Sequence, residues 1–111
     1  MMKKTSKRAL KIKHHILMDV KNATLDLPIK SKVLERRYGV GGTTIREVVH
    51  YLRTVDREPI CSDSTGYYFP KNRTEAQHTI AQLRSRVKEI NEVANAIEGY
   101  FRQESQQGLE L

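Results

Sequence analysis

The sequence predicts a mainly α-helical protein with a small β component. Three observations support this fold class: apolar residues recur at helical spacing in several segments, a glycine-rich corner joins two of them, and two β-prone runs flank a turn. A chain of 111 residues allows one small domain with an appendage. We therefore predict a basic flexible arm at 1–8, a folded domain at 9–71, a long helix at 72–104 and a disordered tail at 105–111.

The first predicted helix is marked by a stripe of apolar residues: Ala9, Ile12, Ile16, Leu17 and Val20. We expect this helix to end near residues 22–24. The next segment, 25–28, is predicted to be extended, because Pro28 biases the residue before it toward β conformations. Such a segment is able to pair with a later hairpin.

A second helix is predicted to begin at Ser31 as its N-cap, with Glu35 one turn later. It would bury Val33, Leu34 and Tyr38. Its outer side carries Arg36 and Arg37, which either brace DNA phosphates or remain a solvated charge pair.

Glycines 39, 41 and 42 permit a tight corner before a third helix. Thr44 and Glu47 have the spacing of a capping box, and Thr43 is the rival cap. The buried face of this helix follows the helical period: Ile45, Val48, Val49 and Leu52. The outward face is polar: Thr43, Arg46, Glu47, His50 and Arg53.

This polar face suits a DNA major groove, where arginine reads guanine edges and threonine contacts phosphates or a thymine methyl group. The alternative is an ordinary corner of two helices with a solvated face. The following segment, 58–70, favours the first interpretation, because its two β-prone runs around residues 63–66 predict a hairpin. Two helices followed by a hairpin are the order of a winged helix-turn-helix. The tip of this wing carries Asp63 and no Lys or Arg, although Gly66 permits a close approach of its backbone to DNA.

Residues 11–70 resemble the winged-helix domain of GntR-type bacterial regulators. The matching residues are Leu27-Pro28, Gly39-Val40, Thr43-Thr44-Ile45-Arg46-Glu47 and Leu52. The resemblance implies that Arg46 reaches bases, that Thr43 and Thr44 contact phosphate, and that Gly66 approaches the minor groove. The chain departs from the pattern in one extra residue between Pro28 and Gly39 and in the absence of basic residues on the wing. The stretch at 59–69 is also similar to small winged-helix proteins of phages and mobile elements.

The positive charge is concentrated in the amino-terminal half of the chain. Residues 1–22 hold seven Lys or Arg against one Asp, a net charge of +6, and residues 23–57 hold seven against four acidic residues, a net charge of +3. Residues 58–111 have a net charge of −2, which completes the formal +7. This distribution fits phosphate attraction. Four basic residues of the arm either enter an adjacent minor groove or raise solubility: Lys3, Lys4, Lys7 and Arg8.

Other classes of function find little support in the sequence. The single Cys61 fits a reducing cytoplasm. His14 and His15 diverge by about 100° on a helix, so we expect a surface His beside a half-buried one and no metal. We find no nucleophile constellation, no phosphate loop with a following Lys and no run long enough to span a membrane. We therefore expect neither an enzyme nor a cofactor.

From residue 72 the pattern becomes a long helix with apolar residues at alternating spacings of four and three. The predicted seam starts at Ala76 and continues through the dimerisation residues: Ile80, Leu83, Val87, Ile90, Ala94, Ile97 and Phe101. We favour a homodimeric coiled coil, because a helix of about 45 Å exceeds what a small domain covers. Packing back on the folded domain and a four-helix arrangement stay open, since Val93 and Tyr100 widen the stripe.

The sequence thus predicts a cytoplasmic, homodimeric, sequence-specific binder of double-stranded DNA. We expect a small transcriptional regulator, a repressor, of bacterial or phage origin. The alternative is a phage or mobile-element accessory protein that uses the wing and the coiled coil to bind a replication or host protein. Loss of salt-sensitive DNA binding on Arg46→Ala distinguishes the first from the second.

Overall fold

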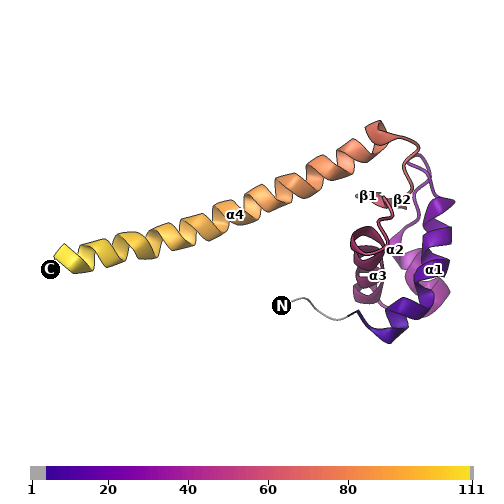
Figure 1. Cartoon of the computed structure of the whole chain (residues 1–111), viewed down its shortest axis with the longest axis horizontal. Helices are drawn as coiled ribbons and strands as arrows, with labels where there is room; N and C mark the ends of the chain where they lie inside the picture. The colour runs from indigo at the N-terminus through magenta and orange to yellow at the C-terminus, as the bar shows by residue number, and fades with distance from the viewer. Residues whose placement is uncertain (1–4, 111) are drawn as a thin grey trace. The chain divides into compact units, whose positions relative to one another are not determined.

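The computed structural model describes residues 5–110, and the side chains of residues 5–103. The mainly helical class is confirmed, with 68% helix and a small antiparallel sheet. The elements follow in the order α1 (Lys7–Lys21), α2 (Ser31–Tyr38), α3 (Gly42–Thr54), β1 (Cys61–Asp63), β2 (Gly66–Tyr68) and α4 (Arg73–Glu110) (Figure 1). The chain divides into two units, one ending at Thr79 and the other beginning at Ile80, and we describe each by itself.

Helix α1 begins at Lys7 because Ser6 caps it. The Ser6 hydroxyl accepts a hydrogen bond from the Ala9 amide at 3.1 Å, which satisfies one of the free amides of the first turn. The prediction that the flexible arm extends to residue 8 is therefore wrong, since Lys7 and Arg8 belong to the helix. Lys3 and Lys4 lie outside the described residues. The predicted end is confirmed, with Asn22 as the C-cap.

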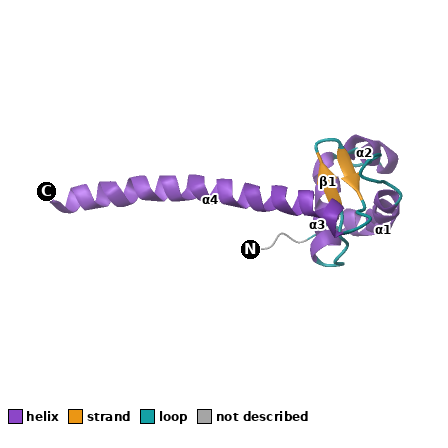
Figure 2. Ribbon diagram, turned by 90° about the horizontal axis from the view of Figure 1, so that it is seen from above, coloured by secondary structure: helices purple, strands orange, loops and turns teal. Residues whose placement is uncertain are grey.

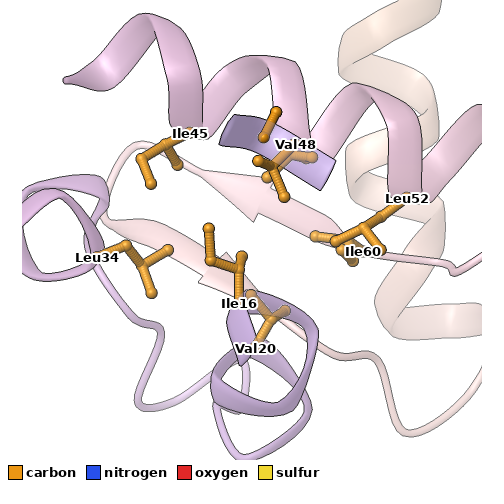
Figure 3. Packing of buried hydrophobic residues seen from close by; sticks show 9 residues of the cluster. Ile16, Val20, Leu34, Ile45, Val48, Leu52 and Ile60 are labelled. Atoms are coloured by element: carbon orange, nitrogen blue, oxygen red, sulfur yellow. The ribbon is translucent and has the colours of Figure 1, made fainter. Parts of the chain in front are cut away.

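One hydrophobic core joins the first three helices (Figure 3). Ile16 and Val20 of α1 meet Leu34 of α2, and a row of residues from α3 closes the cluster from the other side. Its buried members are Ala9, Ile16, Val20, Leu34, Ile45, Val48, Val49, Leu52 and Ile60. The predicted apolar faces of α1 and α3 are thus confirmed. Burial of each Leu, Ile or Val side chain stabilises the fold by about 1.5–3 kcal/mol relative to leaving it exposed. This cluster therefore holds α2 and α3 in place against α1.

Helix α2 departs from two predictions. Its N-cap is Lys30, with no side-chain cap, so Ser31 is the first helical residue and its hydroxyl donates to Glu35 Oε2 at 3.0 Å. The prediction of a Ser31 cap is wrong. Val33 is 40% exposed and was wrongly placed in the core, whereas Leu34 is fully buried. Only one position per turn of this short helix faces α1 and α3.

The segment between α1 and α2 is bent rather than extended. Thr24 and Leu27 exchange backbone hydrogen bonds of 3.2 and 3.1 Å, so the prediction of an extended stretch at 25–28 is wrong. The pairing with the hairpin exists one residue later. Ile29 and Tyr67 exchange two backbone hydrogen bonds of 2.8 Å each, as an isolated antiparallel bridge.

The predicted hairpin is confirmed, with β1 and β2 antiparallel (Figure 2). Cys61 pairs with Tyr68, Ser62 with Tyr67, and Asp63 with Gly66. Side chains alternate along β2, because Tyr68 is fully buried beside Cys61 and Ala23 while Tyr67 packs against the main core.

The first two turns of α4 belong to the folded unit. Asn72 caps the helix by accepting from the Glu75 amide at 3.0 Å. The Tyr68 hydroxyl donates to the Glu75 carbonyl oxygen at 3.1 Å, and Thr79 both accepts from the Ser62 amide and donates to its carbonyl. Ala76 packs on the cluster around Tyr68. The predicted boundary at 71 and the inclusion of Ala76 in the seam are therefore wrong, because these contacts fasten residues 73–79 to the hairpin.

Beyond Ile80, helix α4 is a separate unit. Its side chains from residue 81 to residue 103 are exposed, and the helix continues to Glu110 rather than ending at residue 104. The side chains of the predicted disordered tail lie outside the described residues. Within the described chain, no helix has the length and apolarity needed to cross a membrane.

Candidate nucleic-acid interface

The corner between α2 and α3 is built by a left-handed glycine. Gly39 has φ 61° and ψ 41°, and its amide donates to the Glu35 carbonyl oxygen, as does the Val40 amide at 3.0 Å. A residue with a side chain is strained in this conformation, so glycine is the favoured choice. Arg8 Nη2 donates to the Gly39 carbonyl oxygen from the side of α1. The corner therefore holds α3 at a fixed angle to α2.

Helix α3 starts differently from the prediction. Its N-cap is Gly41, and no side chain caps its first amides. The predicted capping box of Thr44 and Glu47 is wrong, and so is the rival cap at Thr43, because all three residues already lie inside the helix. Their side chains are consequently placed on the helix surface.

The exposed face of α3 carries Thr43, Arg46 and His50. These positions follow one another at about one helical turn and lie opposite the core residues. Arg46 Nη2 donates to Thr43 Oγ1 at 3.2 Å, so the guanidinium is held over the first turn of the helix. Gly42 leaves room there, because a Cβ at that position would lie 3.4 Å from Arg46 Nη1 and 3.5 Å from Glu35 Oε2. Thr44 is half-buried beside this row.

Two residues predicted on the same face are instead engaged within the folded unit. Glu47 accepts hydrogen bonds from the Ser6 amide at 2.9 Å and the Ser6 hydroxyl at 3.1 Å. Arg53 Nε donates to the Ile60 carbonyl oxygen at 2.8 Å, and its Nη2 donates to Ser62 Oγ at 3.2 Å. Glu47 thus anchors the start of α1, and Arg53 fastens the hairpin to α3.

The two arginines of α2 also differ from each other. Arg37 Nη1 forms an ion pair of 3.0 Å with Asp19 Oδ1, and the Tyr38 hydroxyl donates to the other oxygen of that carboxylate. Burial and then the Asp19 carboxylate raise the pKa of Tyr38. Arg36 is exposed. Of this pair, Arg36 is the one that points away from the packed side of α2.

The tip of the hairpin is organised by Asp63. Its Oδ1 accepts from the Thr65 amide at 2.7 Å, the Thr65 hydroxyl at 2.5 Å and the Gly66 amide at 3.2 Å. These hydrogen bonds from Thr65 and Gly66 lower the pKa of the Asp63 carboxyl below its ordinary value. Gly66 has φ 153°, and a Cβ there would lie 2.5 Å from the Ile29 carbonyl oxygen. The close approach of this glycine is therefore to the strand-like residue before α2.

An open cleft separates the hairpin from the start of α2, and sequence reasoning missed its basic residues. Lys30 and Lys32 line one wall, and hydroxyl groups of Ser62, Ser64 and Thr65 line the other. Tyr67 also lines the cleft; burial raises the pKa of its hydroxyl, while the guanidinium groups of Arg53 and Arg46 act in the opposite sense. In the sequence these basic residues are visible only as two lysines that flank Ser31. They add to the net charge, but their spacing does not predict that they line a cleft.

No metal cluster is found among the described residues, in which no three His, Cys, Asp or Glu side chains converge. His14 and His15 are both exposed, which corrects the expectation that one is half-buried. Their rings lie edge to face with centroids 6.4 Å apart, and His15 stacks on Tyr38 at a centroid distance of 6.2 Å. Comparison of the chain with protein-family models, with curated proteins and with solved structures gave no match.

Proposed function

We propose that the chain binds double-stranded DNA through a winged helix-turn-helix formed by α1–α3 and the hairpin, and that it acts as a homodimeric regulator. The observation that carries this proposal is the row of Thr43, Arg46 and His50 on the exposed face of α3. A helix of this width fits a major groove, and arginine is the commonest reader of guanine there.

The basic residues around this row supply the attraction to phosphates. Lys30 and Lys32 lie beside the hairpin cleft, and Arg36 is exposed on α2. Contacts of this kind position a protein on the duplex and carry no sequence information. We assign base reading to Arg46 and phosphate binding to Thr43, Lys30 and Lys32, whereas Glu47 and Arg53 act by holding the fold.

A protein-binding role is the second candidate, and the exposed seam of α4 favours it. Val87, Ile90 and Ile97 are 57–67% exposed, a surface that suits another helix. In this alternative the seam captures a replication or host protein, and the basic unit has no preferred DNA sequence.

Electrophoretic mobility shift with DNA from the chain's own upstream region tests the proposal. Arg46→Ala is expected to weaken binding by about 1–3 kcal/mol, the value of a good base contact. Lys11→Ala removes the same charge from an exposed position of α1 and is the matched control. Equal losses for both variants, with no dependence on DNA sequence, would reject base reading by Arg46 and favour the second candidate.

A further inference from the structure

The exposed apolar seam of α4 is flanked by residues on both sides. The partners of these flanking residues depend on whether a second helix runs parallel or antiparallel to α4. Core positions are taken by the apolar residues spaced four and three apart from Ile80 onward. The flanks next to this seam fall into two rows. One row is Arg84, Asn91 and Glu98; the other is Arg86, Val93 and Tyr100. All six side chains are exposed. Their pairing with a second copy depends on the direction of that copy.

In a parallel pair, each residue of the second row faces the residue five positions later in the other helix, which belongs to the first row. Arg86 then meets Asn91, and Val93 meets Glu98. Neither contact joins opposite charges, and the Glu98 carboxylate is placed against an aliphatic side chain. The parallel orientation therefore leaves Arg84, Arg86 and Glu98 without complementary partners across the seam.

In an antiparallel pair, the first row of one helix faces the first row of the other helix, and the second row faces the second row. Within each row, the numbers of two facing residues therefore add up to the same value. In the register centred near residue 92, Arg84 faces Glu98 of the second copy, and this contact occurs twice by symmetry. Arg86 faces Tyr100, which places a guanidinium beside an aromatic ring, again twice. Val93 meets its own copy at the centre.

The same register pairs apolar residues in the core layers from Leu83 to Phe101, whereas Ile80 lies opposite position 104, a glutamate in the sequence. Leu83 lies opposite Phe101, Val87 opposite Ile97, and Ile90 opposite Ala94, so the small side chain meets a large one. A shift of the register by one heptad removes the contact between Arg84 and Glu98. Asn91 then faces Arg84 if the register shifts one way, and Glu98 if it shifts the other way. Within one chain Glu98 already pairs with Arg102 at 2.7 Å, but both groups are largely exposed, and such a pair contributes little.

We propose that α4 binds a second copy of this chain in an antiparallel orientation, in the register centred near residue 92. The proposal rests on the homodimer of the proposed function and names its geometry. The two Ile80 positions, where α4 leaves the folded units, would be about 36 Å apart along the pair, from twenty-four residues at ~1.5 Å each.

Distances between spin labels on the full-length chain test the orientation. Ala81→Cys and Glu92→Cys are exposed sites, and Cys61 is buried, so the unsubstituted chain measures background labelling. The antiparallel register predicts a separation of at least ~33 Å for labels at residue 81 and about 20 Å at residue 92. Short separations of about 20 Å at both sites would mean a parallel pair and would overturn the inference.

Charge reversal tests the register independently. Arg84→Glu alone and Glu98→Arg alone each create like charges at the facing positions, so each homodimer should weaken on the order of tenfold. A mixture of the two variants restores both opposite-charge contacts and should recover tight association as a heterodimer. Lys88→Glu changes the same charge on the outer side and is the control. Failure of the mixture to recover association would overturn the register.

These outcomes separate the inference from the proposed function. Sedimentation reports the dimer and mobility shift reports DNA binding, each without reference to orientation. A dimer that binds DNA but gives short label distances overturns only the antiparallel geometry. A monomer at all concentrations overturns both the geometry and the homodimer.

Discussion

Arg46 is the residue to which we assign base reading, and its neighbours limit where it points. The hydrogen bond to Thr43 directs the guanidinium toward the first turn of α3, and Gly42 removes any side chain from its path. Because recognition helices contact bases mainly with their N-terminal residues, this direction suits the proposed role.

Glu47 lies one position further along the chain and has a different task. Glu47→Ala removes both hydrogen bonds to Ser6 and frees the cap of α1. We expect a loss of about 0.5–2 kcal/mol in the free energy of unfolding, measured by urea denaturation. The affinity for DNA, measured where the variant is fully folded, should change little. A large loss of affinity without loss of stability would instead make Glu47 a DNA contact.

The sequence predicts α3 well but not the contacts of its polar residues. Ile45, Val48, Val49 and Leu52 show the helical period, because burial of one face depends on residues close together in the chain. The partner of Glu47 is Ser6, which lies 41 residues away, so no local spacing reveals it. The capping-box pattern at Thr44 and Glu47 was misleading for a different reason: the extended backbone that starts the helix occurs earlier, at Gly41.

At the scale of elements, the hairpin is held on three sides. Ile29 pairs with Tyr67, Arg53 donates to Ile60 and Ser62, and Thr79 clamps the backbone of Ser62 from α4. The hairpin itself was predictable from its β-prone runs and turn residues. The contributions of Ile29 and Thr79 were not, because a single bridge and a single helical hydroxyl leave no periodic pattern.

Gly66→Ala tests this arrangement. The added methyl group would lie 2.5 Å from the Ile29 carbonyl oxygen, so the bridge between Ile29 and Tyr67 must open. We expect a loss of about 1–3 kcal/mol in the free energy of unfolding by thermal or urea denaturation. Gly41→Ala, where a Cβ meets nothing within 4 Å, is the matched control and should cost less. Equal stability of Gly66→Ala and the unsubstituted chain would contradict the close contact.

At the scale of the whole molecule, the proposed function assigns DNA binding to the folded unit and dimerisation to the seam of α4. The large apolar residues of the seam from Leu83 to Phe101 are exposed, and the predicted dimerisation through them remains a proposal. Ala76 was assigned to the seam because it continues the same spacing, yet it packs beside Tyr68. Periodicity identifies an apolar face but not which partner covers each part of it.

Val87→Asp combined with Ile90→Asp tests the contribution of the seam in the full-length chain. Both side chains are exposed, so the folded unit should be unaffected while the pair of helices is lost. We expect a monomer by sedimentation and a loss of DNA affinity of at least tenfold, because two linked DNA-binding units bind more tightly than one. Ser85→Asp, on the opposite side of the helix, should leave both unchanged. A dimer that survives the double substitution would exclude this seam as its interface.

The central claim, that the exposed row on α3 reads DNA sequence, is tested most directly by selecting binding sites from random duplex DNA with the full-length protein. We expect enrichment of an inverted repeat, with half-sites about one helical turn apart, and loss of that motif with Arg46→Ala. Recovery of DNA without any shared motif, or of the same motif with Arg46→Ala, would contradict the claim.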